Sequence, residues 1–270
     1  MNIPKSKIAI LTTVANFELY KKTSLFFPKG IKQYVIDGTN HMYGRDSIVY
    51  MISKFKNLGV EWLIMADEDV IFSQPNQIFS IIEKMNRDDF TVSGVRDGGV
   101  VKHRNHNPHL INTFFSILNI KNILQIWDKK EMLKNQYIIP NEFTDNLDYL
   151  SYAYDESSLF ELYYCFYLWL RRHDKKFLFL DAKMEADGIA NTVYFNNVPI
   201  LCHTWYARNY SKDHENTKRI DGYIPKTRPE ISMNNNPIIF KDKFYILKVL
   251  YPLFKDKIIK TKNVLVAKFS

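Results

Sequence analysis

The first hundred residues alternate between short apolar segments rich in β-branched residues and segments whose apolar side chains recur at helical spacing. The strand-like segments are residues 7–14 (KIAILTTV), 32–37 (KQYVID), 61–67 (EWLIMAD) and 89–95 (DFTVSGV). Helical spacing is found within residues 43–58 and again within 78–85. This order predicts an α/β fold with a mixed, largely parallel sheet flanked by helices. In such sheets ligands bind at the carboxyl ends of the strands.

The rest of the chain is less regular. Residues 120–133 are predicted to be helical, and residues 157–172 (SSLFELYYCFYLWLRR) are apolar almost all round, as expected of a buried helix. Residues 176–181 and 198–203 are predicted strands. The polar segment 140–156 is long enough to indicate a functional loop.

Composition narrows the class of protein. Of the 270 residues, 46% are hydrophobic, which is ample for the core of one large domain. The two cysteines, Cys165 and Cys202, lack metal-binding spacing and indicate a reducing compartment. The longest apolar run, residues 162–170, is much shorter than the roughly 20 residues that span a bilayer. A soluble, cytoplasmic protein is therefore expected.

The net charge of +8 is concentrated at the C-terminal end. Residues 241–268 contain eight lysines and two aspartates, so they contribute +6 of it (8 − 2). The remainder is nearly neutral, which argues against a nucleic-acid-binding protein. Lysines mixed with aromatic and aliphatic residues suit a helical segment, divided by Pro252, on the anionic inner face of a membrane. The alternative is a helical cap packed on the domain.

The predicted strand at 61–67 runs directly into three acids, Asp67, Glu68 and Asp69. Acids this close repel one another and resist burial, unless a positive charge lies beside them. In an extended chain Asp67 and Asp69 point to one side and Glu68 to the other. Two converging carboxylates suit a hard dication such as Mg²⁺ or Mn²⁺. The alternative is a solvated acidic turn.

These features resemble the GT-A-fold, D-x-D-containing glycosyltransferases. The resemblance rests on the βαβ half, the D-x-D sequence after an apolar strand and a histidine near a later strand end, in HTWYARNY (203–210). VIDGTNHMYGRDS (35–47) adds a similarity to bacterial surface-polysaccharide and lipopolysaccharide transferases. The DDGSxD sequence common in the family is absent, since only Asp37-Gly38-Thr39 occurs here.

The resemblance implies a Rossmann-like catalytic domain over residues 1–210. Residues 1–100 would form its nucleotide-sugar-binding half and residues 101–210 its acceptor-binding half. Residues 211–270 would then be a mobile segment followed by the basic C-terminal helical extension.

The resemblance also implies a metal site. Asp69 would bind Mn²⁺ (or Mg²⁺), Asp67 would contact the metal or the ribose of the donor, and His203 would be the third protein ligand. An imidazole ligand favours Mn²⁺. For His203, a core histidine bonded to a backbone carbonyl is an equally open interpretation.

Further residues would bind the nucleotide. Small hydroxyl groups and carboxylates at strand ends can hydrogen-bond a uracil edge and sugar hydroxyls, and an arginine fork can bind a diphosphate. The residues implied are Thr12, Thr13, Asn16, Asp37 and Arg45. The alternative for Thr13 is capping of the following helix, and Asp46 is the expected N-cap of the helix within 43–58.

An inverting transferase needs a base for the acceptor hydroxyl. Asp155, with Glu156 beside it, precedes the predicted buried helix, where the family places such an acid. The alternative is that both acids stabilise the helix dipole. His103, His106 and His109 lie in a polar loop without a nearby cysteine, which favours an acceptor-binding loop over a zinc site.

Taken with the resemblance, these residues predict a metal-dependent hexosyltransferase. It would move a sugar from a nucleotide-sugar donor, UDP-linked, to a glycan or lipid-linked acceptor in cell-surface polysaccharide synthesis. One alternative is a sugar nucleotidyltransferase or other metal-dependent nucleotide enzyme, although LTTVANFE (11–18) lacks the glycine-rich loop usual there. Another is a non-catalytic binding protein that shares the GT-A fold.

Overall fold

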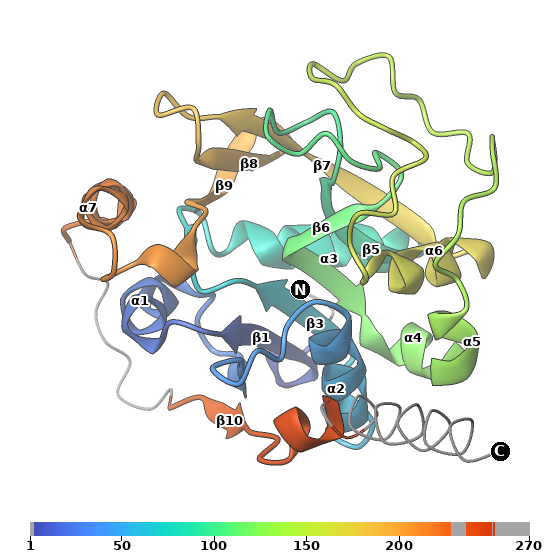
Figure 1. The fold of residues 1–270 in the computed structure, drawn as a ribbon, viewed down its shortest axis with the longest axis horizontal. Helices are drawn as coiled ribbons and strands as arrows, with labels where there is room; N and C mark the ends of the chain where they lie inside the picture. Colours follow the sequence, from blue (N-terminus) through green and yellow to red (C-terminus); the bar gives the residue numbers. More distant parts are fainter. Residues whose placement is uncertain (1–2, 228–235, 250, 252–270) are drawn as a thin grey trace, which may run out of the picture.

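A computed structural model describes residues 3–227, 236–249 and 251 of the chain. Within these residues helices α1 to α7 accompany a sheet of ten strands, and residues 245–249 are helical as well (Figure 1). The strands are β1 (Ile8–Val14), β2 (Lys32–Asp37), β3 (Trp62–Ala66), β4 (Val70–Phe72), β5 (Phe90–Arg96), β6 (Ile111–Asn119), β7 (Lys176–Met184), β8 (Asn191–Phe195), β9 (Val198–His203) and β10 (Ile238–Phe240). The helices are α1 (Phe17–Thr23), α2 (Arg45–Phe55), α3 (Gln77–Arg87), α4 (Ile120–Ile126), α5 (Lys129–Leu133), α6 (Tyr164–Arg172) and α7 (His214–Tyr223).

The sheet is mixed, with the strand order β10-β2-β1-β3-β6-β5-β7-β8-β9-β4. Strands β10, β2, β1 and β3 are parallel to one another, as is the pair β5 and β7. The other neighbours are antiparallel, because β6 inserts between β3 and β5 and because β7, β8, β9 and β4 run in alternating directions. The mixed α/β class is therefore confirmed. The sheet as a whole is not largely parallel, because more than two neighbouring strands are parallel only from β10 to β3.

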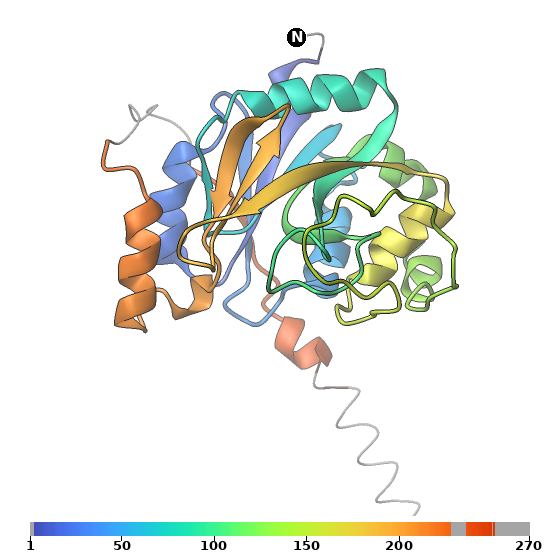
Figure 2. The same cartoon turned by 90° about the horizontal axis from the view of Figure 1, so that it is seen from above.

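Strand β1 shows how the sheet is buried on both faces. Ile8 and Ile10 belong to the hydrophobic cluster that includes α3, whereas Ala9 and Leu11 belong to the cluster that includes α2 and α6. This division follows from the two-residue period of a strand. Figure 2 shows α3 across one face of the sheet, with α2 and α6 on the opposite face.

Helix α2 lies within the segment where the sequence predicts a helix, but it begins differently. Its N-cap residue is Gly44, at φ +57°, and no side chain caps the helix. Asp46 lies in the first turn and accepts a hydrogen bond from the Tyr245 hydroxyl at 2.6 Å. The predicted capping role of Asp46 is therefore wrong, because its carboxylate is bonded to the C-terminal segment instead.

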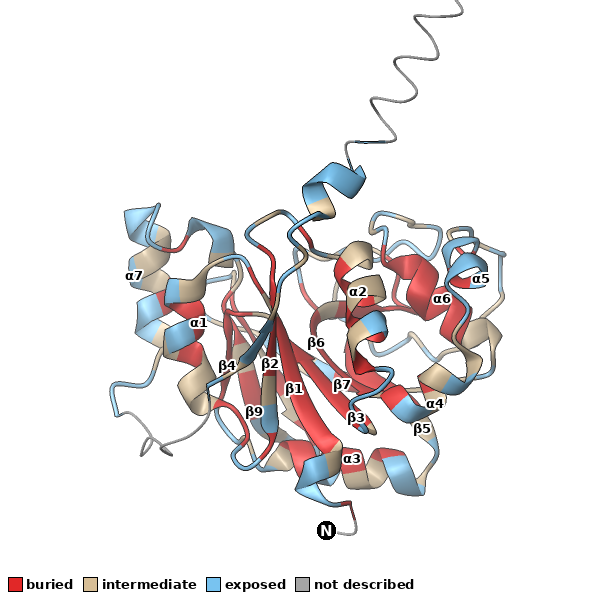
Figure 3. Cartoon of the chain, turned by 90° about the horizontal axis from the view of Figure 1, so that it is seen from below, coloured by how far each residue is buried: buried red, intermediate tan, exposed pale blue. Residues whose placement is uncertain are grey.

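Two other predicted helices have different bounds. Residues 120–133 form α4 and α5 separately, because Asp128 interrupts them and accepts hydrogen bonds from the backbone N–H groups of Lys130 and Glu131. The buried helix predicted at 157–172 begins only at Tyr164. Its buried character is confirmed, since every residue from Tyr164 to Leu170 is buried (Figure 3).

The C-terminal part contributes to the sheet through β10, which pairs with β2. The turn after β10 is attached to the β2–α2 connection, since the Asn40 side-chain amide donates to the Asp242 carbonyl at 3.1 Å. Most of the lysine-rich tail, including Pro252, lies outside the described residues. Among the helices that are described, none has both the length and the apolar character needed to cross a membrane.

Candidate metal centre

The acidic sequence forms a turn between two buried strands. The backbone N–H of Asp67 donates to the Phe114 carbonyl of β6 at 2.8 Å, and the N–H of Val70 donates to the Asp67 carbonyl at 3.1 Å. The second bond closes a four-residue turn. Asp67 and Asp69 are thus brought together by a turn, and not by the alternation of an extended strand that the sequence suggested.

His203 is placed beside this turn by the antiparallel pairing of β4 with β9. Val70 is opposite His203 in the register, and the next residue, Thr204, donates from its backbone N–H and its hydroxyl to the Asp69 carbonyl, each at 3.1 Å. Asp67, Asp69 and His203 consequently offer ligand atoms that all lie within 4.8 Å of one another. The structure therefore brings together all three residues predicted as metal ligands.

The surroundings of His203 are aromatic. Its ring stacks on Phe114 with centroids 4.1 Å apart and lies 4.3 Å from the ring of Trp205. Nε2 is 3.3 Å from Asp69 Oδ1, whereas the buried Nδ1 has no hydrogen-bond partner among the described residues. Within the described part of the chain this ring thus makes no bond to a backbone carbonyl, which the core-histidine interpretation required. Two carboxylates and one imidazole are a donor set that suits Mn²⁺.

Burial and neighbouring charges raise the pKa values of two acids in this turn, Asp67 and Glu68. Burial, followed by the charges of Asp69 and Glu68, raises the pKa of Asp67 well above its ordinary range, while Arg208 opposes the shift. Burial and the charge of Asp69 raise the pKa of Glu68 to about 7. The Glu68 carboxylate accepts hydrogen bonds from the backbone N–H groups of Ala15 and Asn16, both at 3.0 Å. A dication between Asp67 and Asp69 would relieve this repulsion.

The three residues line a cleft of about 500 Å³ at the carboxyl ends of β1 and β3. Across the cleft lie Tyr43, from the β2–α2 connection, and Arg208, from the segment after β9. The guanidinium carbon of Arg208 is 4.1 Å from the centroid of the Tyr43 ring, so the two side chains stack. The cleft therefore combines a candidate cation site with an arginine fork and an aromatic face.

The predicted nucleotide-binding residues lie in different environments. Thr13 lines the cleft, whereas Thr12 is buried in β1. Asn16 caps α1 and donates through its amide to the carbonyls of Ala207 and Tyr210, at 3.1 and 2.9 Å. Its position thus fits the capping interpretation, and its bonds also hold the segment that carries Arg208.

Asp37 and Arg45 are outside the cleft lining. Asp37 accepts a hydrogen bond from the Lys241 ammonium at 2.6 Å and another from the Thr39 backbone at 3.1 Å. Arg45 lies 3.5 Å from Asp46, with 37% of its side chain exposed. The structure does not bring these two residues to the acids.

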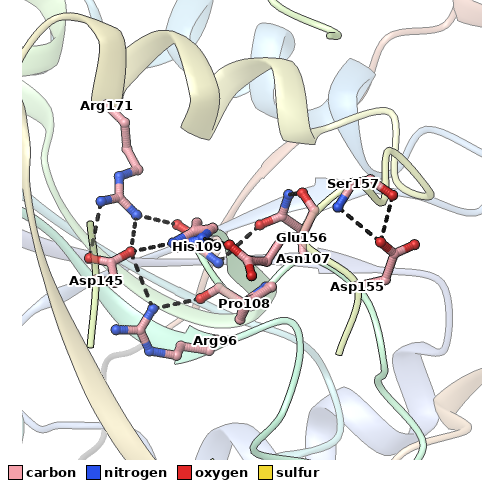
Figure 4. A network of polar contacts seen from close by, with 9 residues as sticks. All are labelled: Arg96, Asn107, Pro108, His109, Asp145, Asp155, Glu156, Ser157 and Arg171. Carbon is pink, nitrogen blue, oxygen red and sulfur yellow. Dashed lines mark hydrogen bonds and ion pairs between the residues drawn. The ribbon is translucent and has the colours of Figure 1, made fainter. Parts of the chain in front are cut away.

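The two predicted base residues also lie outside the cleft lining. Asp155 accepts hydrogen bonds from the backbone and the hydroxyl of Ser157, at 2.9 and 2.6 Å. Glu156 is 2.8 Å from Nε2 of His109, and Nδ1 of the same ring is 2.6 Å from Asp145 (Figure 4). Both carboxylates therefore have local partners. Glu161, which the sequence did not single out, does line the cleft and is paired with Arg104 at 3.0 Å.

The three loop histidines do not converge. His103 lies against Trp205 with centroids 4.5 Å apart, and His106 stacks on Phe160 at 4.1 Å. His109 is held between two carboxylates. No metal site among these three is found in the described residues.

The cleft residues that sequence reasoning missed are Tyr43, Arg208 and Glu161. Arg208 and Tyr43 had a signal, since each lies in a segment that carries the family resemblance, HTWYARNY and VIDGTNHMYGRDS. Glu161 had none, because its position depends on how distant loops pack around the cleft.

Comparison with known proteins gives little further information. No family model and no curated protein matches the chain. Among solved structures, it is similar to the crystal structure of a glycosyltransferase involved in the glycosylation of the major capsid of PBCV-1. The two share 19% identity at a TM-score of 0.29, over 44% of this chain and 62% of that one. Similarity this low establishes neither a shared fold nor a shared activity.

Proposed function

We propose that this chain is a metal-dependent glycosyltransferase of the GT-A type that uses a nucleotide-sugar donor. The observation that carries the proposal is the convergence of Asp67, Asp69 and His203 on one point of a cleft at the carboxyl ends of β1 and β3. Burial and neighbouring acids raise the pKa of Asp67, and a bound cation would relieve the charge repulsion that contributes to this shift. The cleft volume of about 500 Å³ is in the range of small-molecule sites.

In this proposal Asp67, Asp69 and His203 hold Mn²⁺, with Mg²⁺ as the alternative ion. A dication held there would neutralise the charge of a departing diphosphate. Arg208 supplies a planar fork for the same phosphates, and its stack on Tyr43 fixes the direction of that fork. Tyr43 and Thr13 line the space where a nucleoside would lie, which we take to be that of a UDP-sugar.

The acceptor hydroxyl is the second reactant. Sequence reasoning placed the base at Asp155 or Glu156, and both remain predictions. Glu161 is the candidate that the cleft itself favours, because it lines the cavity that also contains the three metal-site residues. The proposed acceptor is a glycan or a lipid-linked saccharide in cell-surface polysaccharide synthesis, bound by residues 101–210.

The C-terminal segment supports a membrane-associated location. Phe244, Leu247 and Tyr251 are exposed by 64%, 62% and 69%, and Lys243 and Lys248 lie among them. Apolar side chains mixed with lysines suit the surface of an anionic membrane. We propose that the protein is cytoplasmic and binds peripherally to the inner face of the membrane through this segment.

Vesicle binding tests this location. We expect co-sedimentation with vesicles that contain phosphatidylglycerol, but not with phosphatidylcholine alone. Phe244→Ser combined with Leu247→Ser should abolish binding, while the control Leu162→Ser, at a residue 58% exposed elsewhere, should not. Equal binding of the double variant would contradict the proposal.

Calorimetry with UDP, with and without Mn²⁺, tests the main proposal. We expect UDP to bind only with Mn²⁺, slow Mn²⁺-dependent hydrolysis of a UDP-sugar, and loss of both in Asp69→Asn. The exposed Asp148→Asn is the matched control and should behave as the unaltered protein. Binding without hydrolysis or transfer from any nucleotide-sugar would favour a non-catalytic binding protein. Pyrophosphate release from UTP and a sugar phosphate would favour a nucleotidyltransferase.

A further inference from the structure

A second cavity, of about 400 Å³, lies apart from the metal cleft. It is formed by the β7–β8 hairpin and by two loops, one after β5 and one between α5 and α6, which lie beside this hairpin in Figure 1. Its lining combines aliphatic side chains, such as Leu150 and Met184, with tyrosines and with polar or charged groups. The tyrosines and the polar or charged groups include Tyr149, Tyr152, Tyr194, Asp181, Lys183 and Asn197.

The β7–β8 hairpin forms one wall of the cavity and carries a tyrosine and two charged residues. Asp181 of β7 is directly opposite Tyr194 of β8 in the antiparallel register, so their side chains share one face. Lys183 is two residues further along β7 and is on the same face. Its ammonium lies 5.1 Å from the centroid of the Tyr194 ring. The Asp181 carboxylate has no hydrogen-bond or ion-pair partner within residues 3–227, 236–249 and 251, so its oxygens are available to a ligand.

The opposite wall is held in place by the backbone. The N–H groups of Ser151 and Tyr152 both donate to the Gly99 carbonyl, at 3.1 and 3.0 Å. Gly99 has φ +81°, and a Cβ atom there would lie 2.6 Å from Leu150. The positive φ angle favours glycine here, and the absence of a side chain leaves room for Leu150.

Tyr149 is exposed by 53%, yet its position is also fixed. Its hydroxyl accepts a hydrogen bond from Nε of the buried Arg96 at 2.9 Å. An exposed aromatic ring held by a buried arginine loses little conformational freedom when a ligand binds. The cavity is therefore preorganised on both walls.

We propose that this cavity binds a neutral sugar unit of the acceptor glycan. Tyrosine rings offer apolar faces to the C–H groups of a sugar ring, while the carboxylate, ammonium and amide groups hydrogen-bond its hydroxyls. Asp181 and Lys183 have opposite charges on one face, so the wall favours an uncharged ring. That this sugar belongs to the acceptor rests on the proposed function, whereas the binding of a sugar in this cavity does not. The loop after β5 connects the two sites, because Gly99 lines this cavity and Arg104 lines the metal cleft.

Saturation-transfer NMR on the full chain tests the proposal. The probes are methyl glycosides of glucose, galactose, mannose, rhamnose and N-acetylglucosamine, with methyl glucuronide as a charged comparison. We expect at least one neutral glycoside to bind, and Tyr194→Ala and Asp181→Ala each to weaken that binding roughly tenfold or more. Asp181 is exposed, so its variant keeps the test valid if Tyr194→Ala fails to fold. Tyr154→Ala, at an exposed tyrosine outside the cavity lining, is the matched control.

Three outcomes would overturn the proposal: no neutral glycoside binds, only the glucuronide binds, or binding is unchanged in both cavity variants. Asp69→Asn separates this result from the main proposal. It removes the binding of UDP with Mn²⁺ and should leave glycoside binding intact. If the unaltered chain binds a glycoside but never binds UDP with Mn²⁺, the proposed donor site is wrong and the sugar site stands.

Discussion

Nε2 of His203 lies 3.3 Å from Oδ1 of Asp69, although the two residues come from distant segments of the chain. The ring is held by stacking on Phe114 and by the pairing of β9 with β4. Nδ1 is buried without a partner in the described part of the chain, whereas Nε2 faces the Asp69 carboxylate, so Nε2 is the ring atom that could share the proposed cation with Asp69.

Replacing His203 tests this relationship without an activity assay. We expect His203→Ala to weaken Mn²⁺ binding by roughly 10- to 100-fold, since even the partners of metal ligands contribute that much. Free Mn²⁺ in a titration can be counted by electron paramagnetic resonance. Asp148→Asn serves as the control. Unchanged Mn²⁺ binding in His203→Ala would exclude the imidazole as a ligand.

Arg208 is expected to bind the diphosphate of the donor. In Arg208→Lys the charge is kept, but the planar fork and its stack on Tyr43 are lost. We expect UDP binding in the presence of Mn²⁺ to weaken roughly tenfold, because a hydrogen bond to a charged group contributes roughly 1.5–3 kcal/mol. Calorimetry measures this, with Arg87→Lys on α3 as control. Equal weakening of uridine binding would show that the effect is not on the phosphates.

The identity of the base is tested by a pair of variants. We expect Glu161→Gln to lower kcat for transfer by roughly 10²- to 10⁴-fold, the usual contribution of a general base. UDP binding should be kept, since the amide can still accept the bond from Arg104. Asp155→Asn should have a much smaller effect, because Asp155 lies outside the cleft lining. The reverse pattern would return the role to Asp155.

Asp145 is expected to contribute to stability in a pH-dependent way. Burial raises the pKa of Asp145, but the hydrogen bonds from His109 and Arg171 together lower it by more than burial raises it. The pKa therefore lies below its ordinary range. A lowered carboxyl pKa stabilises the folded state above the unfolded pKa of about 3.9, and the contribution is lost as the pH falls toward the folded pKa. Asp145→Asn should lower the free energy of unfolding by about 3 kcal/mol at pH 7.

Urea unfolding at several pH values measures this effect. The difference between Asp145→Asn and the unaltered protein should shrink below roughly pH 4. Asp148→Asn, three residues away and exposed, should show no difference at any pH. A difference for Asp145→Asn that does not change with pH would mean that packing, and not ionisation, accounts for the loss.

The sequence predicted those parts of the fold that local patterns determine. Strands β1, β2, β3 and β5 and helices α2 and α3 lie where periodicity placed them. The direction of β6 was not predictable, because a strand buried on both faces has no polar alternation, and direction depends on its partners. Strand β4 was missed because it has only three residues and its partner is β9.

In the candidate site, too, the sequence predicted what local patterns determine and missed what depends on tertiary contacts. Asp67 and Asp69 stood out because three consecutive acids after an apolar strand are unfavourable without a cation. His203 came from the family resemblance. Asp37 and Arg45 were placed by the same reasoning but lie outside the cleft lining. The distant Lys241 engages the side chain of Asp37, and the neighbouring Asp46 engages that of Arg45.

The hydrogen bonds from Thr204 to the Asp69 carbonyl join positions 135 residues apart in the chain. A growing polypeptide therefore cannot bring Asp67, Asp69 and His203 together until the ribosome has released β9, when the rest of the sheet up to β8 is already available. The proposed ion would bind only after β9 has paired with β4. It would therefore stabilise the native state and not partly folded intermediates.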